Sequence, residues 1–280
     1  MSLYFHPKTL EEAVSILAQQ GGTILAGGTD FFPALGDRRV TGTVVDISAI
    51  RNMKGITTTG KEHHIGGLTT WTEVVASSLP SSFDAVKAAA REIGGIQIQN
   101  RGTLAGNLCN ASPAADSVPP LLALDAQVEL VSIRGSRRIS LAQFIVGNRK
   151  TLRRPDEILA RVIVPRTIDD AKSAFLKLGA RRYLVISIAM VAVVMKTDGS
   201  RRITDARVAV GSCSLTARRL LKLENALVGT PARTGLGDVV QPDHLLPLSP
   251  IDDVRATAQY RMDAVLTLVA RALEECARSC

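Results

Sequence analysis

Two glycine-rich stretches contain the residues of this chain best suited to bind a ligand. The first is Ala26-Gly27-Gly28-Thr29-Asp30, which follows a short apolar segment typical of a buried strand. Its two glycines allow the backbone to approach a ligand closely and to present successive N–H groups to an anion such as a pyrophosphate. Thr29 adds a hydroxyl donor, and Asp30 is expected to cap the helix that follows. The alternative for a lone Gly-Gly pair is an ordinary tight turn.

The second stretch runs from Asn100 to Asn107 and continues from Ala111 to Asp116. Small residues here again permit close backbone approach, and hydroxyl and amide side chains between them can form hydrogen bonds. Asp116 can accept a hydrogen bond from a ribityl or ribose hydroxyl. A purely structural loop is the alternative. Two such stretches in one chain nevertheless predict a single, long, phosphate-bearing ligand.

Other residue patterns lack the spacing that their chemistry requires. Gly55 to Glu62 nearly matches a P-loop, but Glu62 stands where a Ser or Thr would hold Mg²⁺. The sequence contains no G-x-G-x-x-G, which argues against a Rossmann dinucleotide site. The histidines have no ligand partners at metal-binding spacing, and no C-x-x-C occurs, so we expect neither a metal nor an iron–sulfur cluster in this chain. No catalytic residue is predicted, because no Ser, His and Asp grouping is discernible.

Both stretches must be positioned by a mixture of helices and strands. Thr9, with Glu12 three residues later, predicts the start of a helix that ends at Gly21-Gly22. Residues 94–120 contain many Gly, Asn, Ser, Pro and Ala and few apolar runs, which predicts a long loop, ordered or disordered, of the kind that is usually functional. The other expected elements of this half are strands near 23–26, 43–47, 63–68, 126–131 and 158–164, and helices from 69, from 81 to 93, and from 119.

A polar turn at 167–171 predicts a domain boundary, with one domain at 1–168 and a second at 172–280. Beyond it, strands near 172–178, 185–196 and 206–211 predict an antiparallel meander. Helices are expected at 216–227 and 255–276. The predicted fold class is therefore α+β in two parts.

Composition and charge narrow the function classes. Of 280 residues, 46% are hydrophobic and 21% are charged, which is typical of folded globular proteins and excludes wholesale disorder. The net charge is +8, but the basic doublets are dispersed and aromatics are only 4%, so we expect no nucleic-acid partner. The longest apolar run, 184–195, is too short to span a bilayer, and the N-terminus has no signal-peptide pattern. A cytoplasmic location follows as the expectation.

Taken together, these motifs are similar to a known family. The chain resembles the FAD-binding (medium) subunit of the molybdenum hydroxylases, which include xanthine, carbon monoxide and nicotinate dehydrogenases. The resemblance implies a vanillyl-alcohol-oxidase-type (PCMH-type) FAD-binding domain of two α+β subdomains, followed by a C-terminal domain with a small antiparallel sheet and helices. The segments that carry it are Leu25–Asp30, Ile65–Thr70, Gln99–Asn107, Ala111–Asp116, Leu121–Ala126, Phe175-x-Lys177 and Arg181-Arg182.

The resemblance also implies a set of binding residues. The backbone of the first loop would hold the FAD pyrophosphate; its residues are Ile24, Leu25, Ala26, Gly27, Gly28, Thr29 and Asp30. Asp116 would bond to the adenosine or ribityl part, and Lys177 would approach the flavin from the C-terminal domain. Further contacts would come from Ile93, Gly94 and Ile98 along the cofactor, and from Gly102, Thr103, Gly106, Asn107 and Cys109 in the second loop.

The function implied is that of a non-covalent FAD carrier. It would accept electrons from the [2Fe–2S] clusters of a small partner subunit and pass them to an external acceptor. Molybdopterin and the clusters are expected only in partner subunits, within a dimer of heterotrimers that contains a large molybdenum subunit and the small subunit. Of the basic doublets, Arg153-Arg154 and Arg181-Arg182 are expected to face FAD or an acidic partner surface; the alternative is that they only keep the chain soluble. The alternatives are a self-contained FAD-dependent oxidase and an FAD-binding protein without turnover. Against the oxidase, the first loop contains no histidine that could be linked to a flavin.

Overall fold

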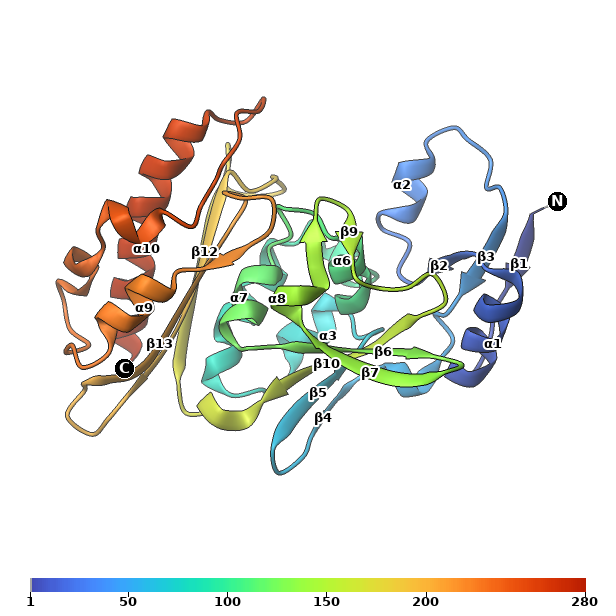
Figure 1. Cartoon of the computed structure of the whole chain (residues 1–280), viewed down its shortest axis with the longest axis horizontal. Coiled ribbons are helices and arrows are strands. Elements are labelled where there is room, and N and C mark those ends of the chain that lie inside the picture. The colour runs from blue at the N-terminus through green and yellow to red at the C-terminus, as the bar shows by residue number, and fades with distance from the viewer. Residues whose placement is uncertain (1) are drawn as a thin grey trace.

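The computed structural model describes residues 2–280 and arranges three larger β-sheets one after another along its length (Figure 1). The N-terminal strands lie at one end and the C-terminal helices at the other. Helices and strands are mixed throughout, as the α+β prediction requires.

The first sheet has three parallel strands in the order β1 (Leu3–Phe5), β3 (Thr43–Asp46) and β2 (Thr23–Leu25). Helix α1 (Leu10–Gln20) packs against it through Ala13, Val14 and Leu17. The Thr9 hydroxyl accepts a hydrogen bond from the Glu12 N–H at 3.2 Å, and Gly21 ends the helix with φ +61°. The predicted first helix is thus confirmed with both of its end signals.

The second sheet has five antiparallel strands: β4 (Ile56–Thr58), β5 (Glu62–Gly66), β10 (Ile158–Pro165), β6 (Gln127–Ser132) and β7 (Gly135–Ser140), in that order. Its main core includes residues of α3 (Trp71–Ala76), α4 (Asp84–Glu92) and α7 (Val118–Ala123). Strand β7 was not predicted, because its residues are largely exposed and polar and show no apolar alternation.

Residues 94–120 are not the long loop that their composition predicts. They form helices α5 (Ile96–Gln99) and α6 (Leu104–Asn110) and the start of α7. Leu104 and Leu108 of α6 are fully buried at i, i+4 spacing, and the Thr103 hydroxyl caps the helix by accepting from the Gly106 N–H at 3.1 Å. The prediction was wrong because one buried pair and one cap are sufficient for a helix as short as α6.

The remaining elements between residues 26 and 168 are short. They are α2 (Phe31–Leu35), α8 (Leu141–Phe144), β8 (Ile145–Gly147), β9 (Lys150–Thr151), and the 3₁₀ turns η1 (Arg51–Met53), η2 (Ser81–Phe83) and η3 (Arg166–Ile168).

The third sheet confirms the predicted antiparallel meander. Its strands, in order, are β11 (Lys172–Leu178), β12 (Ala189–Thr197), β13 (Ile203–Gly211) and β14 (Arg218–Arg219). Strand β12 begins at Ala189 rather than 185, after Leu184 adopts a left-handed φ of +51°. The helix expected from 216 begins only at Leu221, because β14 first pairs with β13.

This third sheet is covered by helices on both faces (Figure 1). On one face lie α9 (Leu221–Leu227), α10 (Ala258–Ser279) and the 3₁₀ turns η4 (Leu236–Val239) and η5 (Pro242–Leu245), with an apolar core between. The other face meets α4 and α7 of the preceding region; there Ala85 and Ala89 pack on Phe175 and Met190. In residues 2–280, no helix has the length and apolar character needed to cross a bilayer.

Candidate functional site

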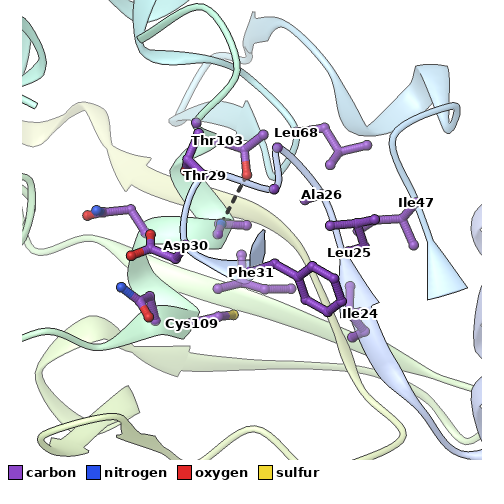
Figure 2. Close-up of a pocket in the computed structure, with 18 of the residues that line it drawn as sticks. Ile24, Leu25, Ala26, Thr29, Asp30, Phe31, Ile47, Leu68, Thr103 and Cys109 are labelled. Atoms are coloured by element: carbon purple, nitrogen blue, oxygen red, sulfur yellow. Dashed lines mark hydrogen bonds between the residues drawn. The ribbon is translucent and has the colours of Figure 1, made fainter. Parts of the chain in front are cut away.

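Both glycine stretches line one cavity of about 430 Å³, which lies where the first and second sheets meet α6 (Figure 2). A volume of this size is within the range of small-molecule and cofactor sites. Most of the residues predicted to bind the ligand lie in its wall: Ile24, Leu25, Ala26, Gly27, Gly28, Thr29, Asp30, Ile93, Ile98, Gly102, Thr103, Gly106, Asn107 and Cys109.

The first loop leaves strand β2 and turns into α2. Leu25 is anchored where its carbonyl accepts from the Ile47 N–H at 2.9 Å, and Gly28 then adopts φ +77°, which favours glycine. A Cβ at Gly27 would overlap the carbonyl oxygen of Arg101. Gly27 therefore allows the two ligand loops to touch, which is a structural role in addition to any contact with a ligand.

Asp30 occupies the position before α2, but its side chain makes no capping hydrogen bond. The prediction that Asp30 caps this helix was therefore wrong, and its carboxylate instead lies in the cavity wall (Figure 2).

The second loop is held by its own backbone and by α3. The Gly102 N–H donates to the Ile98 carbonyl at 2.6 Å, and the Gly102 carbonyl accepts from the Trp71 N–H at 3.3 Å. The Asn107 side-chain oxygen accepts from the Ser117 hydroxyl at 2.6 Å. These bonds fix the loop before any ligand arrives, which lowers the entropy cost of binding.

The cavity also contains three apolar residues that sequence reasoning missed. Ile47, Leu68 and Trp71 line it, although in the sequence they looked like ordinary core positions. Arg153 adds a cation to the wall. It belongs to the Arg153-Arg154 doublet, one of the two doublets expected to face FAD or an acidic partner surface.

Three predicted residues lie outside this wall. Gly94 has φ +60°, and a Cβ there would press on Ile98, so it makes room for a lining residue. Asp116 and Lys177 pair with each other: the Lys177 ammonium donates to the Asp116 carboxylate at 2.6 Å, and the Ser187 hydroxyl donates to it at 2.5 Å.

The Asp116–Lys177 ion pair is buried, with only 7% of each side chain exposed, and it joins the segment before α7 to strand β11. Burial raises the pKa of the Asp116 carboxyl above its ordinary value, although Lys177 and Ser187 both favour its ionised form. A buried pair of this kind costs desolvation energy, so its stability value is smaller than its geometry suggests.

Cys109 is the sulfur-bearing residue of the cavity wall. Burial raises the pKa of its thiol to about 11, in spite of the nearby Arg153 charge. Cys109 is therefore an uncharged, apolar wall residue at neutral pH rather than a nucleophile. Within the described part of the chain, no three His, Cys, Asp or Glu residues are grouped so that they could hold a metal.

Two glycine loops that line one cavity are typical of a protein that binds a phosphate-bearing cofactor. Residues 1–167 match the family model described as the FAD binding domain in molybdopterin dehydrogenase. Residues 174–276 match the CO dehydrogenase flavoprotein C-terminal domain. The chain belongs to this molybdopterin dehydrogenase FAD-binding family, and the resemblance inferred from its motifs is confirmed.

Relatives and solved structures agree with this membership. The chain is 35% identical over 236 residues to the nicotinate dehydrogenase FAD-subunit of Eubacterium barkeri, covering 81% of this chain and 80% of that one. It is 31% identical to the nicotine 6-hydroxylase medium subunit of Paenarthrobacter nicotinovorans, covering 97% and 96%. A chain of carbon monoxide dehydrogenase from Hydrogenophaga pseudoflava superposes with a TM-score of 0.90 at 28% identity, covering 99% and 98%.

Proposed function

We propose that this chain is the FAD-carrying electron-transfer subunit of a molybdenum hydroxylase and that the cavity between its glycine loops is the FAD site. The observation that carries the proposal is the convergence of both loops on one cavity in a chain of this family. Bound FAD would supply the redox chemistry, accepting electrons from the [2Fe–2S] clusters of a partner and giving them up to an external acceptor.

The residues fit FAD in chemical character. The backbone at Gly27 and Gly28 lies in the cavity wall and would offer its N–H groups to a pyrophosphate. Ile93, Ile98 and other apolar side chains would exclude water from a planar ring system. The first loop has no histidine to form a covalent link, so binding would be non-covalent.

Asp116 is proposed to bond to the adenosine or ribityl part of FAD, and Lys177 to approach the flavin. Their ion pair brings a carboxylate and an ammonium from two parts of the chain to one point. The Asp116 carboxylate would accept from a ribose or ribityl hydroxyl, and Lys177 would add positive charge near the flavin. No general base is required of this chain, because substrate hydroxylation would take place elsewhere.

The chain is proposed to work only within a larger enzyme. Its relatives include a nicotine 6-hydroxylase medium subunit and a carbon monoxide dehydrogenase medium chain, names that describe components of assemblies. The assembly we infer is a dimer of heterotrimers, with a large molybdenum-cofactor subunit and a small [2Fe–2S] subunit. Its location would be cytoplasmic.

The finer fold assignment is part of the same proposal. The parallel first sheet and the antiparallel second sheet would be the two α+β subdomains of a PCMH-type, vanillyl-alcohol-oxidase-type FAD domain. That domain would span 1–168, and the third sheet with its helices would be the C-terminal domain at 172–280.

Co-expression with the neighbouring large and small subunits tests the subunit role. The three chains are expected to elute together in gel filtration, with FAD released on acid denaturation and dehydrogenase activity only in the complex. A flavoprotein that elutes alone and turns over a substrate would instead support the self-contained oxidase. A flavin-loaded chain that joins no complex and has no activity would support a binding protein without turnover.

A further inference from the structure

Arg153 lines the cavity but belongs to neither glycine loop. It lies half-buried between β9 and β10, where its Nη1 donates to the backbone carbonyls of Arg154 at 3.0 Å, Pro155 at 3.2 Å and Glu157 at 2.7 Å. One nitrogen therefore fixes the guanidinium to its own turn. Within residues 2–280, its Nε and Nη2 have no hydrogen-bond partner.

The charge of Arg153 is not neutralised by the protein around it. The neighbouring Glu157 carboxylate is paired with other groups: it accepts from the Arg137 guanidinium at 2.6 Å and from the Arg154 N–H at 2.7 Å. No carboxylate of the described chain forms an ion pair with Arg153. Its field reaches the cavity, since it acts on the Cys109 thiol and opposes the rise of that pKa. A fixed guanidinium with free donors in a cavity wall favours an anionic ligand group.

The geometry of α6 indicates which part of a ligand would meet this charge. Residues Ile98 to Thr103 precede α6, whereas Cys109 lies near its far end, about 10 Å away along the helix. Ile93 belongs to the first of these ends, because the Gln99 side chain donates to the carbonyls of Arg91 at 3.0 Å and Gly94 at 3.3 Å, on either side of Ile93. The flavin proposed to lie beside Ile93 and Ile98 would therefore send its other half toward Cys109 and Arg153.

We propose that Arg153 recognises the adenylate half of FAD and makes the cavity selective for the dinucleotide over the mononucleotide FMN. This inference rests on the proposed FAD site and adds a specificity-determining residue to it. The free Nε and Nη2 donors would form charge-assisted bonds with phosphate oxygen on the adenosine side, which FMN lacks.

Titration of the full apo chain with FAD and FMN, and competition with ADP, tests the assignment. Arg153→Leu is expected to raise the Kd for FAD, and that for ADP, at least about tenfold, which is the range for losing a hydrogen bond to a charged group. The Kd for FMN should stay within about twofold. Arg154→Leu is the matched control: it removes the same charge from an exposed neighbour outside the cavity wall, and all three affinities should remain at the wild-type values.

The outcomes separate this inference from the proposed function. If the wild-type chain binds FAD but Arg153→Leu behaves like Arg154→Leu, or weakens FAD and FMN equally, the role of Arg153 is refuted and the FAD site stands. If the wild-type chain binds none of the three ligands, both fail. Because Arg153 also holds its own turn, salt dependence gives a second readout. FAD affinity should fall less steeply with added salt in Arg153→Leu than in Arg154→Leu, and equal slopes would contradict the assignment.

Discussion

Removing the charge of Lys177 should destabilise this protein far more than removing a comparable surface charge. Lys177→Met leaves the Asp116 carboxylate buried and without its counter-ion, with only the Ser187 hydroxyl bond remaining. Breaking one side of a buried ion pair costs about 3–5 kcal/mol. Lys196 offers a matched control on the neighbouring strand β12, because it pairs with Asp170 at 3.0 Å and the Asp170 side chain is 66% exposed. Lys196→Met should cost less than about 1 kcal/mol.

The assay is urea unfolding of the full apo chain, followed by circular dichroism and tryptophan fluorescence. The double variant Lys177→Met with Asp116→Asn removes both charges, so its loss should be smaller than the sum of the single losses by at least about 1 kcal/mol. Because burial raises the pKa of Asp116, proton uptake should relieve the unpaired carboxylate, and the deficit of Lys177→Met should shrink as the pH falls. A Lys177→Met loss no larger than that of Lys196→Met would refute the reasoning.

Two further predictions follow from the loops and from the C-terminal region. Gly27→Ala should force the two ligand loops apart at the Arg101 carbonyl, which should destabilise the chain by about 1–3 kcal/mol and weaken FAD binding. Gly60→Ala is the control, because its new methyl group enters open space and should change neither stability nor FAD binding. Equal flavin titrations for the two variants would contradict the close contact between Gly27 and Arg101. Burial alone would raise the pKa of Asp253, but hydrogen bonds from the Arg255 backbone N–H and the Arg261 guanidinium hold that pKa at about 2. This lowered pKa contributes stability above about pH 4, and that stability is lost as the pH falls toward 2. The urea midpoint of Asp253→Asn should therefore fall less steeply over this pH range than that of the wild-type chain. Equal slopes for the two chains would contradict the proposed role of Asp253.

The glycine loops were predictable because few residues other than Gly leave backbone accessible to a ligand, and the sequence places the first of them directly after an apolar strand segment. Their convergence on one cavity was not visible from spacing, since about 75 residues separate Gly27 from Gly102. The sequence singled out the Arg153-Arg154 doublet but not which of its two residues would reach the cavity. That depends on the turn that fixes the Arg153 guanidinium, which the sequence does not reveal.

The errors in the fold prediction have similar physical causes. Helix α6 is too short for a periodic pattern, and its stability comes from burying Leu104 and Leu108 against the second sheet. Strand β7 is defined by pairing with β6 rather than by its own polar residues. The meander of the third sheet was easier to predict, because long apolar strands separated by a turn carry their signal locally.

Trp71 allows the central claim to be tested without any label. It is the single tryptophan of the chain, is almost completely buried, and lines the cavity proposed to hold FAD. Titrating the full apo chain with FAD should quench its emission by energy transfer to the flavin, with saturation at one FAD per chain. FAD should then be released intact on denaturation. Trp71 emission that does not change while FAD binds would place the flavin elsewhere, and a chain that binds no FAD would contradict the account altogether.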